Sequence, residues 1–344
     1  MKKPFTLFSF TFVFLSASFS QDIHFSQFYA APLQLNPAFT GVFNGNIRGV
    51  INYRNQWQSF APYNTFAGSV DMNFGQSFLE NDLIGVGISF FSDKAGESDF
   101  ATTQGNLSAS YIKTLGNKFS RSYLTVGFQG GFAQRSINQA TMTFGNQYNG
   151  YSYDESLSSG ETMPFENFTY VDLAGGISWL FVPKDRLNIY SGVAFHHLTQ
   201  PDQSFAGSGD NLYVRSTYNL GAQVPLGEKF DIVPGILVQM QGPHYEFVGG
   251  LNFKYYISEK SYNESAFSLG GWQRMGIDEQ LEYKSDATVI TARYDFMGLS
   301  AGLSYDINIS ALKEASNSFG GPELSIIYTA NLPHRDRKVD CPKF

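Results

Sequence analysis

The side chains that could do chemistry in this 344-residue chain are few and widely spread. His196 and His197 are its only adjacent histidines, and imidazole pairs are common ligands of zinc. Neighbouring residues of a β-strand point to opposite faces, so one metal ion cannot easily take both rings. We therefore expect a structural role for these two histidines, near the end of a strand.

Charged residues of both signs occupy the polar positions of segments that are otherwise apolar on alternate residues. A ring of one sign would indicate ion selectivity, whereas a mixture favours salt bridges that brace an interior or hold a plug. No P-loop, GxGxxG, HExxH or GxSxG motif is present, so we expect neither an enzyme nor a bound cofactor. The candidate bracing residues are Arg48, Arg54, Asp71, Asp172, Arg215, Glu246, Arg274, Asp306 and Glu323.

β-Strands must position these charges, because the hydrophobic pattern has a period of two. In residues 65–75, Phe66 and Val70 share one face while Ser69 and Asp71 share the other. We count about fourteen such segments, near residues 46–55, 64–75, 82–92, 101–114, 122–135, 168–181, 187–198, 212–225, 229–240, 244–257, 265–275, 283–295, 297–309 and 322–332. The alternation is poor at 106–111 and 288–295, where a bulge would restore the phase.

The segments match the ~9–11 residues that a tilted membrane strand requires. Short connections such as "LGEK" and "DFMG" alternate with long ones at 136–167, 199–211 and 310–321. This alternation and an even strand number are typical of outer-membrane barrels. We predict an all-β fold, a transmembrane antiparallel β-barrel of about 14 strands. A soluble sandwich or propeller would carry a more charged surface.

Composition agrees with a membrane barrel, since only 15% of the residues are charged while 16% are aromatic. The formal net charge of −7 argues against binding to nucleic acid or to an anionic lipid surface. Residues 1–20 have the positive start, short apolar stretch and small-residue cleavage site of a signal peptide. No later stretch approaches 18 uninterrupted apolar residues, so no transmembrane helix is expected.

The predicted organisation is a signal peptide at 1–20, a leader at 21–45, a barrel at 46–332 and a periplasmic tail at 333–344. Pro32 and Pro37 prevent a regular helix or central strand in the leader. We expect the leader on the periplasmic side, either as a plug in the barrel mouth or as a handle for a periplasmic partner. The candidate contact residues are Phe25, Phe28, Tyr29, Asn36, Pro37, Phe39 and, in the tail, Cys341.

The longest connection, residues 136–167, mixes aromatic residues with glycine, asparagine and serine. Such mixtures recur at protein-recognition surfaces. The alternative is an ordinary solvated loop folded on its own aromatics. The candidate partner-binding residues are Phe144, Tyr148, Tyr151, Tyr153 and Phe165.

Several stretches, in order along the mature chain, resemble one family. They are "FSQFYAAPLQLNPAFTG" at 25–41, "YRNQW" at 53–57, "DKAG" at 93–96, "HLTQP" at 197–201, "SYDINIS" at 304–310, "ELSIIY" at 323–328 and the terminal "CPKF". They are similar to the PorP/SprF family, outer-membrane proteins of the type IX secretion system.

The resemblance implies an outer-membrane barrel, in contact with lipid, that helps to secrete or anchor a particular cargo protein or adhesin. Some members serve gliding motility, their cargo carries a C-terminal sorting domain, and their periplasmic side meets other secretion components. The resemblance transfers no catalytic residues. The alternative is a transport barrel for small or hydrophobic solutes, like the long-chain fatty-acid transporters, although a polar inward face disfavours an apolar ligand.

Overall fold

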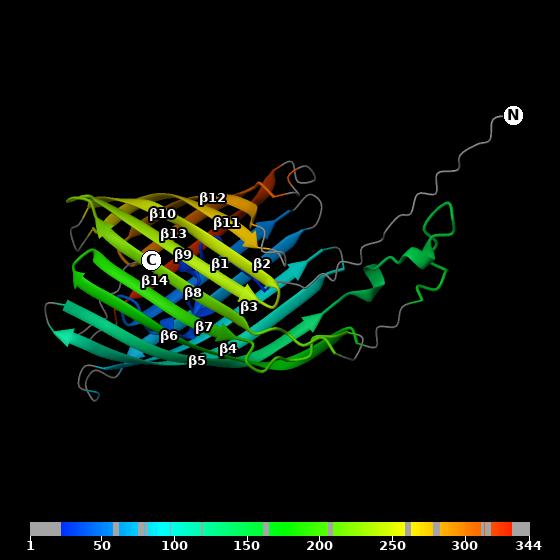
Figure 1. Ribbon diagram of the computed structural model, residues 1–344, viewed down its shortest axis with the longest axis horizontal. Helices are drawn as coiled ribbons and strands as arrows, with labels where there is room; N and C mark the ends of the chain where they lie inside the picture. Colours follow the sequence, from blue (N-terminus) through cyan, green and yellow to red (C-terminus); the bar gives the residue numbers. More distant parts are fainter. Residues whose placement is uncertain are drawn as a thin grey trace.

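The computed structural model describes residues 22–57, 62–74, 79, 82–96, 98–117, 120–160, 165–205, 209–258, 263–277, 283–310, 313 and 318–331. Fourteen strands in this part form one closed antiparallel barrel, in which each strand pairs with its sequence neighbours and β1 pairs with β14 (Figure 1). The strands are β1 (Ile47–Gln56), β2 (Tyr63–Phe74), β3 (Leu83–Ala95), β4 (Phe100–Asn117), β5 (Ser120–Ser136), β6 (Asn167–Lys184), β7 (Leu187–His196), β8 (Arg215–Pro225), β9 (Phe230–Gln241), β10 (His244–Ser258), β11 (Ser265–Ile277), β12 (Tyr283–Phe296), β13 (Leu299–Asn308) and β14 (Phe319–Ala330).

Helical structure is limited to short turns. The leader contains η1 (Phe28–Ala30), α1 (Pro32–Leu35) and η2 (Pro37–Phe39), and the β5–β6 connection contains η3 (Gln139–Thr141) and η4 (Gly145–Gln147). Among the described residues, no helix has the length and apolar character needed to cross a membrane.

The barrel has an apolar outside and a largely polar inside because buried and exposed residues alternate along its strands. On β2, Phe66 and Val70 are exposed on the outer wall, while Ser69 and Asp71 are buried in the lumen. Exposed apolar residues recur on the outward faces of the other strands, so the outer wall offers hydrocarbon to lipid, and the closed ladder leaves no free sheet edge.

The predicted closed barrel of about 14 strands is confirmed. The expected bulges are wrong: β4 runs through 106–111 without a register shift, because its serines face the lumen and Leu107 and Tyr111 face outwards. The irregularity on β12 lies instead between Ser285 and Ala287, opposite Arg274 and Met275.

The two ends of the barrel differ. One end, the long-loop end, carries the connections 137–166 and 197–214, and the first of these projects beyond the right-hand end of the barrel in Figure 1. The other, the short-turn end, carries the connections 185–186, 226–229 and 297–298. Long loops face the cell exterior and short turns the periplasm in outer-membrane barrels.

Candidate functional site: the leader-filled lumen

The leader crosses the lumen from one end to the other. Asp22 donates its backbone N–H to Gln241 (3.2 Å) at the long-loop end, and Asn46 donates its own to Ala330 (2.9 Å) at the short-turn end. The prediction of a leader confined to the periplasmic side is therefore wrong for its first half. The physical reason is twofold. Inside the barrel the apolar side chains of the leader are buried, and its backbone groups find hydrogen-bond partners.

Beside the β1–β14 seam, a buried carboxylate holds the leader backbone. Glu323 accepts the backbone N–H groups of Ser26 (2.7 Å) and Gln27 (2.9 Å). Asp306 accepts the Ser26 hydroxyl (2.7 Å) and pairs with Arg54 (2.7 Å), which also donates to the carbonyl of His24. Charge-assisted bonds of this kind are the stronger class of hydrogen bond, so this cluster ties the leader to β1, β13 and β14.

Arg274 extends the cluster to β11. It pairs with Asp306 (2.9 Å) and with Asp286, and it donates to the hydroxyl of Ser26 (3.0 Å). Glu246, on β10, lies nearer the long-loop end than Arg274, and one of its carboxylate oxygens is 3.8 Å from a ring nitrogen of His24.

A second charged clamp lies near the short-turn end. Arg48 forms a two-pronged pair with Asp71 (2.9 and 2.7 Å) and also donates to the carbonyl of Phe39 (3.0 Å). Asp71 accepts the backbone N–H of Gly41 (2.8 Å) as well. The pair therefore serves both the barrel wall and the end of η2.

Asn36 anchors the middle of the leader. Its side-chain amide donates to the carbonyls of Ile177 and Val193 (3.2 Å each), while its side-chain oxygen caps η2 by accepting from Ala38 (2.8 Å). Gly127 on β5 makes room for this turn, because a Cβ there would lie 2.4 Å from the carbonyl carbon and oxygen of Pro37. The close approach of leader backbone to barrel wall needs glycine at this position.

Aromatic residues of the leader complete the core of the barrel. Phe28 meets Trp272 edge-on, with ring centroids 5.4 Å apart, and Tyr29 contacts the same indole at 5.5 Å. Phe39 meets Tyr190 edge-on at 6.4 Å. Leader and wall therefore share one hydrophobic cluster, and Phe25 packs in a second, smaller one with Ala67 on β2.

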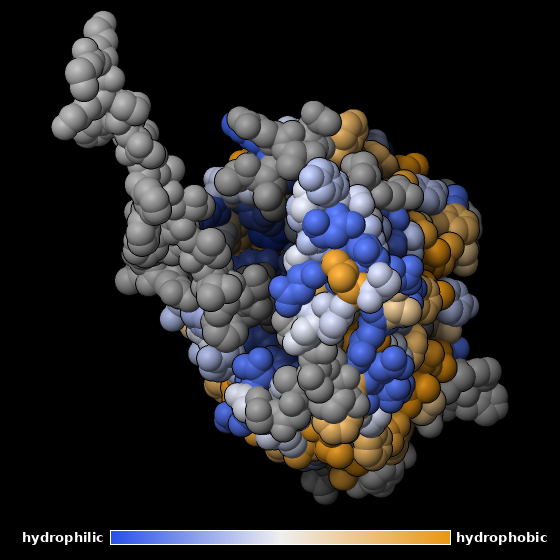
Figure 2. All heavy atoms as spheres, turned by 90° about the vertical axis from the view of Figure 1, so that its right-hand side faces the viewer, coloured by the Kyte–Doolittle hydropathy of each residue, from blue (hydrophilic) through white to orange (hydrophobic). Residues whose placement is uncertain are grey.

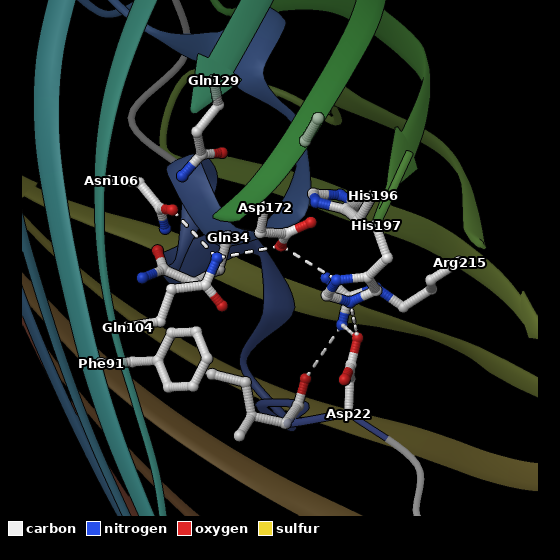
Figure 3. A pocket seen from close by; sticks show the side chains of 12 residues that line it. Asp22, Gln34, Phe91, Gln104, Asn106, Gln129, Asp172, His196, His197 and Arg215 are labelled. Carbon is white, nitrogen blue, oxygen red and sulfur yellow. Dashed lines mark hydrogen bonds and ion pairs between the residues drawn. The ribbon is translucent and has the colours of Figure 1, made fainter. Parts of the chain in front are cut away.

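A polar hollow remains between the leader and β3–β8, towards the long-loop end; we call it the outer hollow (Figure 3). His197 lies at its side between two carboxylates, bonded to Asp22 through one ring nitrogen and 2.9 Å from Asp172 through the other. Burial alone would lower the pKa of His197, but Asp22 and Asp172 together raise it to about 9. Arg215 also pairs with Asp22 (3.4 Å).

Asp22 is held in its charged form by the same contacts. Burial would raise the pKa of its carboxyl group, but His197 and Arg215 outweigh burial and hold the pKa well below its usual value. The first described residue of the leader is therefore fixed by an ion-pair cluster at the end of the barrel that faces outwards.

The histidine pair is not arranged as two opposite residues of one strand. β7 ends at His196, and His197 has a φ of 59°, so the chain turns and both rings line the outer hollow. His196 contacts the carbonyl of Leu35 (3.4 Å). Among the described residues, no group of three or more histidine, cysteine, aspartate or glutamate side chains is arranged so that it could hold a metal ion.

The β5–β6 connection folds into a small hairpin outside the barrel. Tyr148 and Tyr153 pair as an isolated bridge, and Tyr151 at the tip is 95% exposed. Phe165 is exposed near β6, and Phe144 is half-buried at the start of η4. The five predicted partner-binding residues therefore all lie on this loop. The predicted signal peptide and Cys341 lie outside the described residues.

The structure places all nine predicted bracing residues in the lumen, but in separate clusters. Sequence reasoning missed the polar leader residues, above all Gln27, which donates to Ser304 (3.2 Å) and accepts from Ser325 (2.9 Å). The inward serines Ser300 and Ser304 on β13 and Ser325 on β14 were a usable signal, because a buried hydroxyl group needs a hydrogen-bond partner.

Solved structures with a similar outline are outer-membrane proteins. The toluene transporter TodX of Pseudomonas putida is 11% identical with a TM-score of 0.43, over 86% of this chain and 91% of that one. CdiB from Acinetobacter baumannii is 8% identical with a TM-score of 0.42, over 82% of this chain and only 60% of that one. At these levels the likeness carries no functional inference.

Sequence comparison is more specific. No curated protein matches the chain. The model of one family, described as type IX secretion system membrane protein PorP/SprF, matches residues 17–328, which is nearly the whole barrel and leader. With the closed transmembrane barrel, this match assigns the protein to the outer membrane and to type IX secretion, and the chain belongs to the PorP/SprF family.

Proposed function

We propose that this barrel holds a particular cargo protein of the type IX system at the cell surface, through the hairpin of its β5–β6 loop. The cargo is an adhesin that carries a C-terminal sorting domain, and one role of this adhesin is in gliding motility. Other secretion components meet the barrel at its short-turn end. The role is binding without catalysis.

The observation that carries the proposal is the exposed tyrosine hairpin. Tyr148, Tyr151 and Tyr153 are 59%, 95% and 48% exposed, on a loop that stands clear of the barrel. Tyrosines among glycine, serine and asparagine offer contact area at low entropic cost, which is the composition of a binding loop. Tyrosine is also enriched among the residues that carry most of the binding energy at protein interfaces.

The filled lumen supports binding over transport. The leader occupies the centre of the barrel and is bonded to the wall at several levels, through its backbone N–H groups to Glu323 and Asp71 and through the side chain of Asn36. Within the part of the chain that the structure describes, each remaining hollow has charged side chains in its lining, which does not suit the continuous apolar path that a hydrophobic solute would need.

The test replaces Tyr148, Tyr151 and Tyr153 with serine in the native strain. Barrel abundance should be unchanged, while surface display of the cargo and its co-purification with the tagged barrel should fall. The matched control replaces Thr143, Ser152 and Ser158, which are exposed on the same loop, with alanine. Normal display in the tyrosine variant would reject the proposal. A deletion strain that loses uptake of hydrophobic nutrients, but not secretion, would favour the transport alternative.

A further inference from the structure

β6 continues past β7 at the long-loop end and has an open side there. The β6–β7 ladder begins only at Gly175, opposite Phe195, whereas the β5–β6 ladder extends outwards to Asn167. Beyond Gly175, no other described strand or bridge continues the sheet beside β6. We call residues 167–171, the outermost part of this strand, the β6 edge. Such edges present backbone groups that are ready to pair with another chain.

Two contacts fix which backbone groups face the open side. The carbonyl of Leu173 accepts the backbone N–H of Leu198 (3.0 Å), and the carbonyl of Val171 accepts the hydroxyl of Thr199 (2.9 Å). The N–H and C=O of one strand residue point to the same side, and alternate residues share that side. Because the β5–β6 register has no shift, Thr169 also points its N–H and C=O away from β5. The β6 edge therefore offers donors and acceptors to a further strand.

The β6 edge lacks the features that protect a free edge. It contains no proline and no charged residue, and most of its residues are aromatic or β-branched. At the same end β12 also runs past its neighbour β13, at residues 283–285, but it carries Lys284 and a bulge between Ser285 and Ala287. Lysine and bulges discourage pairing with another chain. The contrast indicates that β6 is left open for a partner.

The β6 edge lies at the outer limit of the lipid. Near the short-turn end, Trp179 and Phe181 stack on the outer wall, as expected for the aromatic girdle at one membrane surface. Thr169 is ten residues from Trp179, which at ~3.3 Å per residue and a tilt of ~40° gives a height of about 25 Å. The apolar band of such barrels has the same height. Figure 2, which looks onto the long-loop end, shows hydrophilic residues around its mouth, so a partner outside the cell reaches this level through water.

The rings beside the β6 edge describe the side chains of the partner. Phe168 and Tyr170 lie on the lumen side of β6, with centroids 6.2 Å apart, and both are only partly buried. Phe205, from the β7–β8 connection, meets Phe168 edge-on at 5.0 Å. A strand added to β6 would place every second side chain beside these rings. Apolar or aromatic residues at alternate positions suit that arrangement.

A symmetric second copy of the chain does not fit the β6 edge. Two barrels of a dimer in one membrane are related by an axis along the membrane normal. Their β6 strands would tilt by ~40° in opposite directions and cross at roughly 80°. Neighbouring strands of a sheet differ in direction by only ~20–25°. A polypeptide outside the membrane has no such restriction.

From these observations we infer that the β6 edge binds an extended strand of the cargo protein, with apolar side chains at alternate positions, as an added strand of the barrel sheet. The inference rests on the proposed function, because the partner is the cargo that the tyrosine hairpin holds, and it adds how the cargo backbone is held. The β5–β6 connection leads directly from the hairpin into Asn167, so one partner reaches both.

The test uses the cargo that co-purifies with the tagged barrel and whose surface display depends on it. Hydrogen exchange is compared between this complex and the full-length barrel from a strain that lacks the cargo. In the complex, the backbone amides of Thr169 and Val171 should exchange roughly tenfold more slowly or less, because they become bonded to the added strand. Amides in the middle of the barrel strands should be unchanged.

Thr169→Pro removes a backbone N–H that faces the open side and spares the bonds to β5. Cargo binding should weaken roughly five- to tenfold, the loss expected for one backbone hydrogen bond. Thr169→Val is the matched control, because it keeps the N–H and should bind normally. A second pair guards against misfolding of the proline variant. Thr169→Lys places a charge on the edge and should weaken binding, whereas Gln134→Lys places it opposite, on β5, and should not.

The outcomes separate the inference from the proposed function. Cargo that binds without protecting the β6 edge overturns the inference and leaves the proposed function intact, as does equal binding by both members of each variant pair. A barrel that binds no cargo rejects the proposed function and the inference with it. Protection of the β6 edge that appears in the barrel alone, and increases with its concentration, would assign the edge to a second copy and overturn the inference.

Discussion

Gly127→Ala should loosen the leader without opening the barrel wall. The new Cβ would lie 2.4 Å from two atoms of Pro37 and 2.5 Å from the backbone nitrogen of Ala38, whereas ordinary contact begins at 3.4 Å. The leader must therefore retreat by about 1 Å, and backbone atoms cannot escape by changing rotamer. Overpacking costs typically ~1–3 kcal/mol, and a rigid contact belongs at the upper end of that range. About 3 kcal/mol corresponds to a change of roughly 100-fold in the docking equilibrium.

Hydrogen exchange of the purified barrel measures this directly. The backbone amides of Leu35, Asn36, Phe39 and Thr40 are bonded within the leader, so their exchange reports its opening. In Gly127→Ala they should exchange roughly 100-fold faster, while strand amides stay protected. Gly105→Ala is the matched control, because Gly105 lies on the outer wall of β4 and a Cβ there meets nothing within 4 Å. Equal protection of the leader in both variants would refute the tight fit of η2 against β5.

Three further predictions concern the charged contacts and the lumen. Glu323→Gln should lower the free energy of unfolding by about 1–3 kcal/mol, because the amide oxygen and nitrogen of glutamine cannot both accept the two leader N–H groups. Gel-shift unfolding in detergent measures this loss, and a loss no larger than that caused by Glu228→Gln at an exposed position would contradict the role of the carboxylate. The contacts of His197 raise its pKa from 6.5 to about 9, so the stability that they contribute is complete below pH 6.5 and is lost as the pH rises through about 9. Between pH 7 and pH 10, hydrogen exchange of the first leader amides should therefore accelerate more than the intrinsic exchange rate does. His197→Gln should abolish this extra acceleration. If the variant shows the same extra acceleration, another group causes it. The intact protein in planar bilayers should show little steady conductance, since the leader runs through the lumen and shares a hydrophobic cluster with the wall, and large open-pore currents would contradict this.

Local periodicity made the wall of the barrel predictable. Each strand shows its own inside and outside in the alternation of residues such as Phe66 and Asp71, so no distant contact is needed to recognise it. Observed strand bounds differ from the predicted segments by at most three residues, as at Arg215, where β8 begins, and at Ala95, where β3 ends. The inward charges followed from the same period, since the phase of a strand fixes the face of every residue on it.

The positive φ of His197 shows where that reasoning stops. Strand phase alone turns the ring of His197 away from that of His196, but the chain leaves the strand at this point and brings both rings to one hollow. A break in the strand depends on the loop that follows it and leaves no periodic trace in the sequence.

The sequence by itself determined the barrel and its largely polar lumen, which depend on period, and the lack of a long helix or central strand in the leader, where Pro32 and Pro37 each begin only a short helical turn. Only the tertiary structure decided that the leader crosses the lumen, that Glu323 receives Ser26 and Gln27 from nearly 300 residues away, and that Asp22 meets His197. A segment without a repeat makes its contacts through individual hydrogen bonds with distant strands. Those pairings become fixed only when the strands close around it.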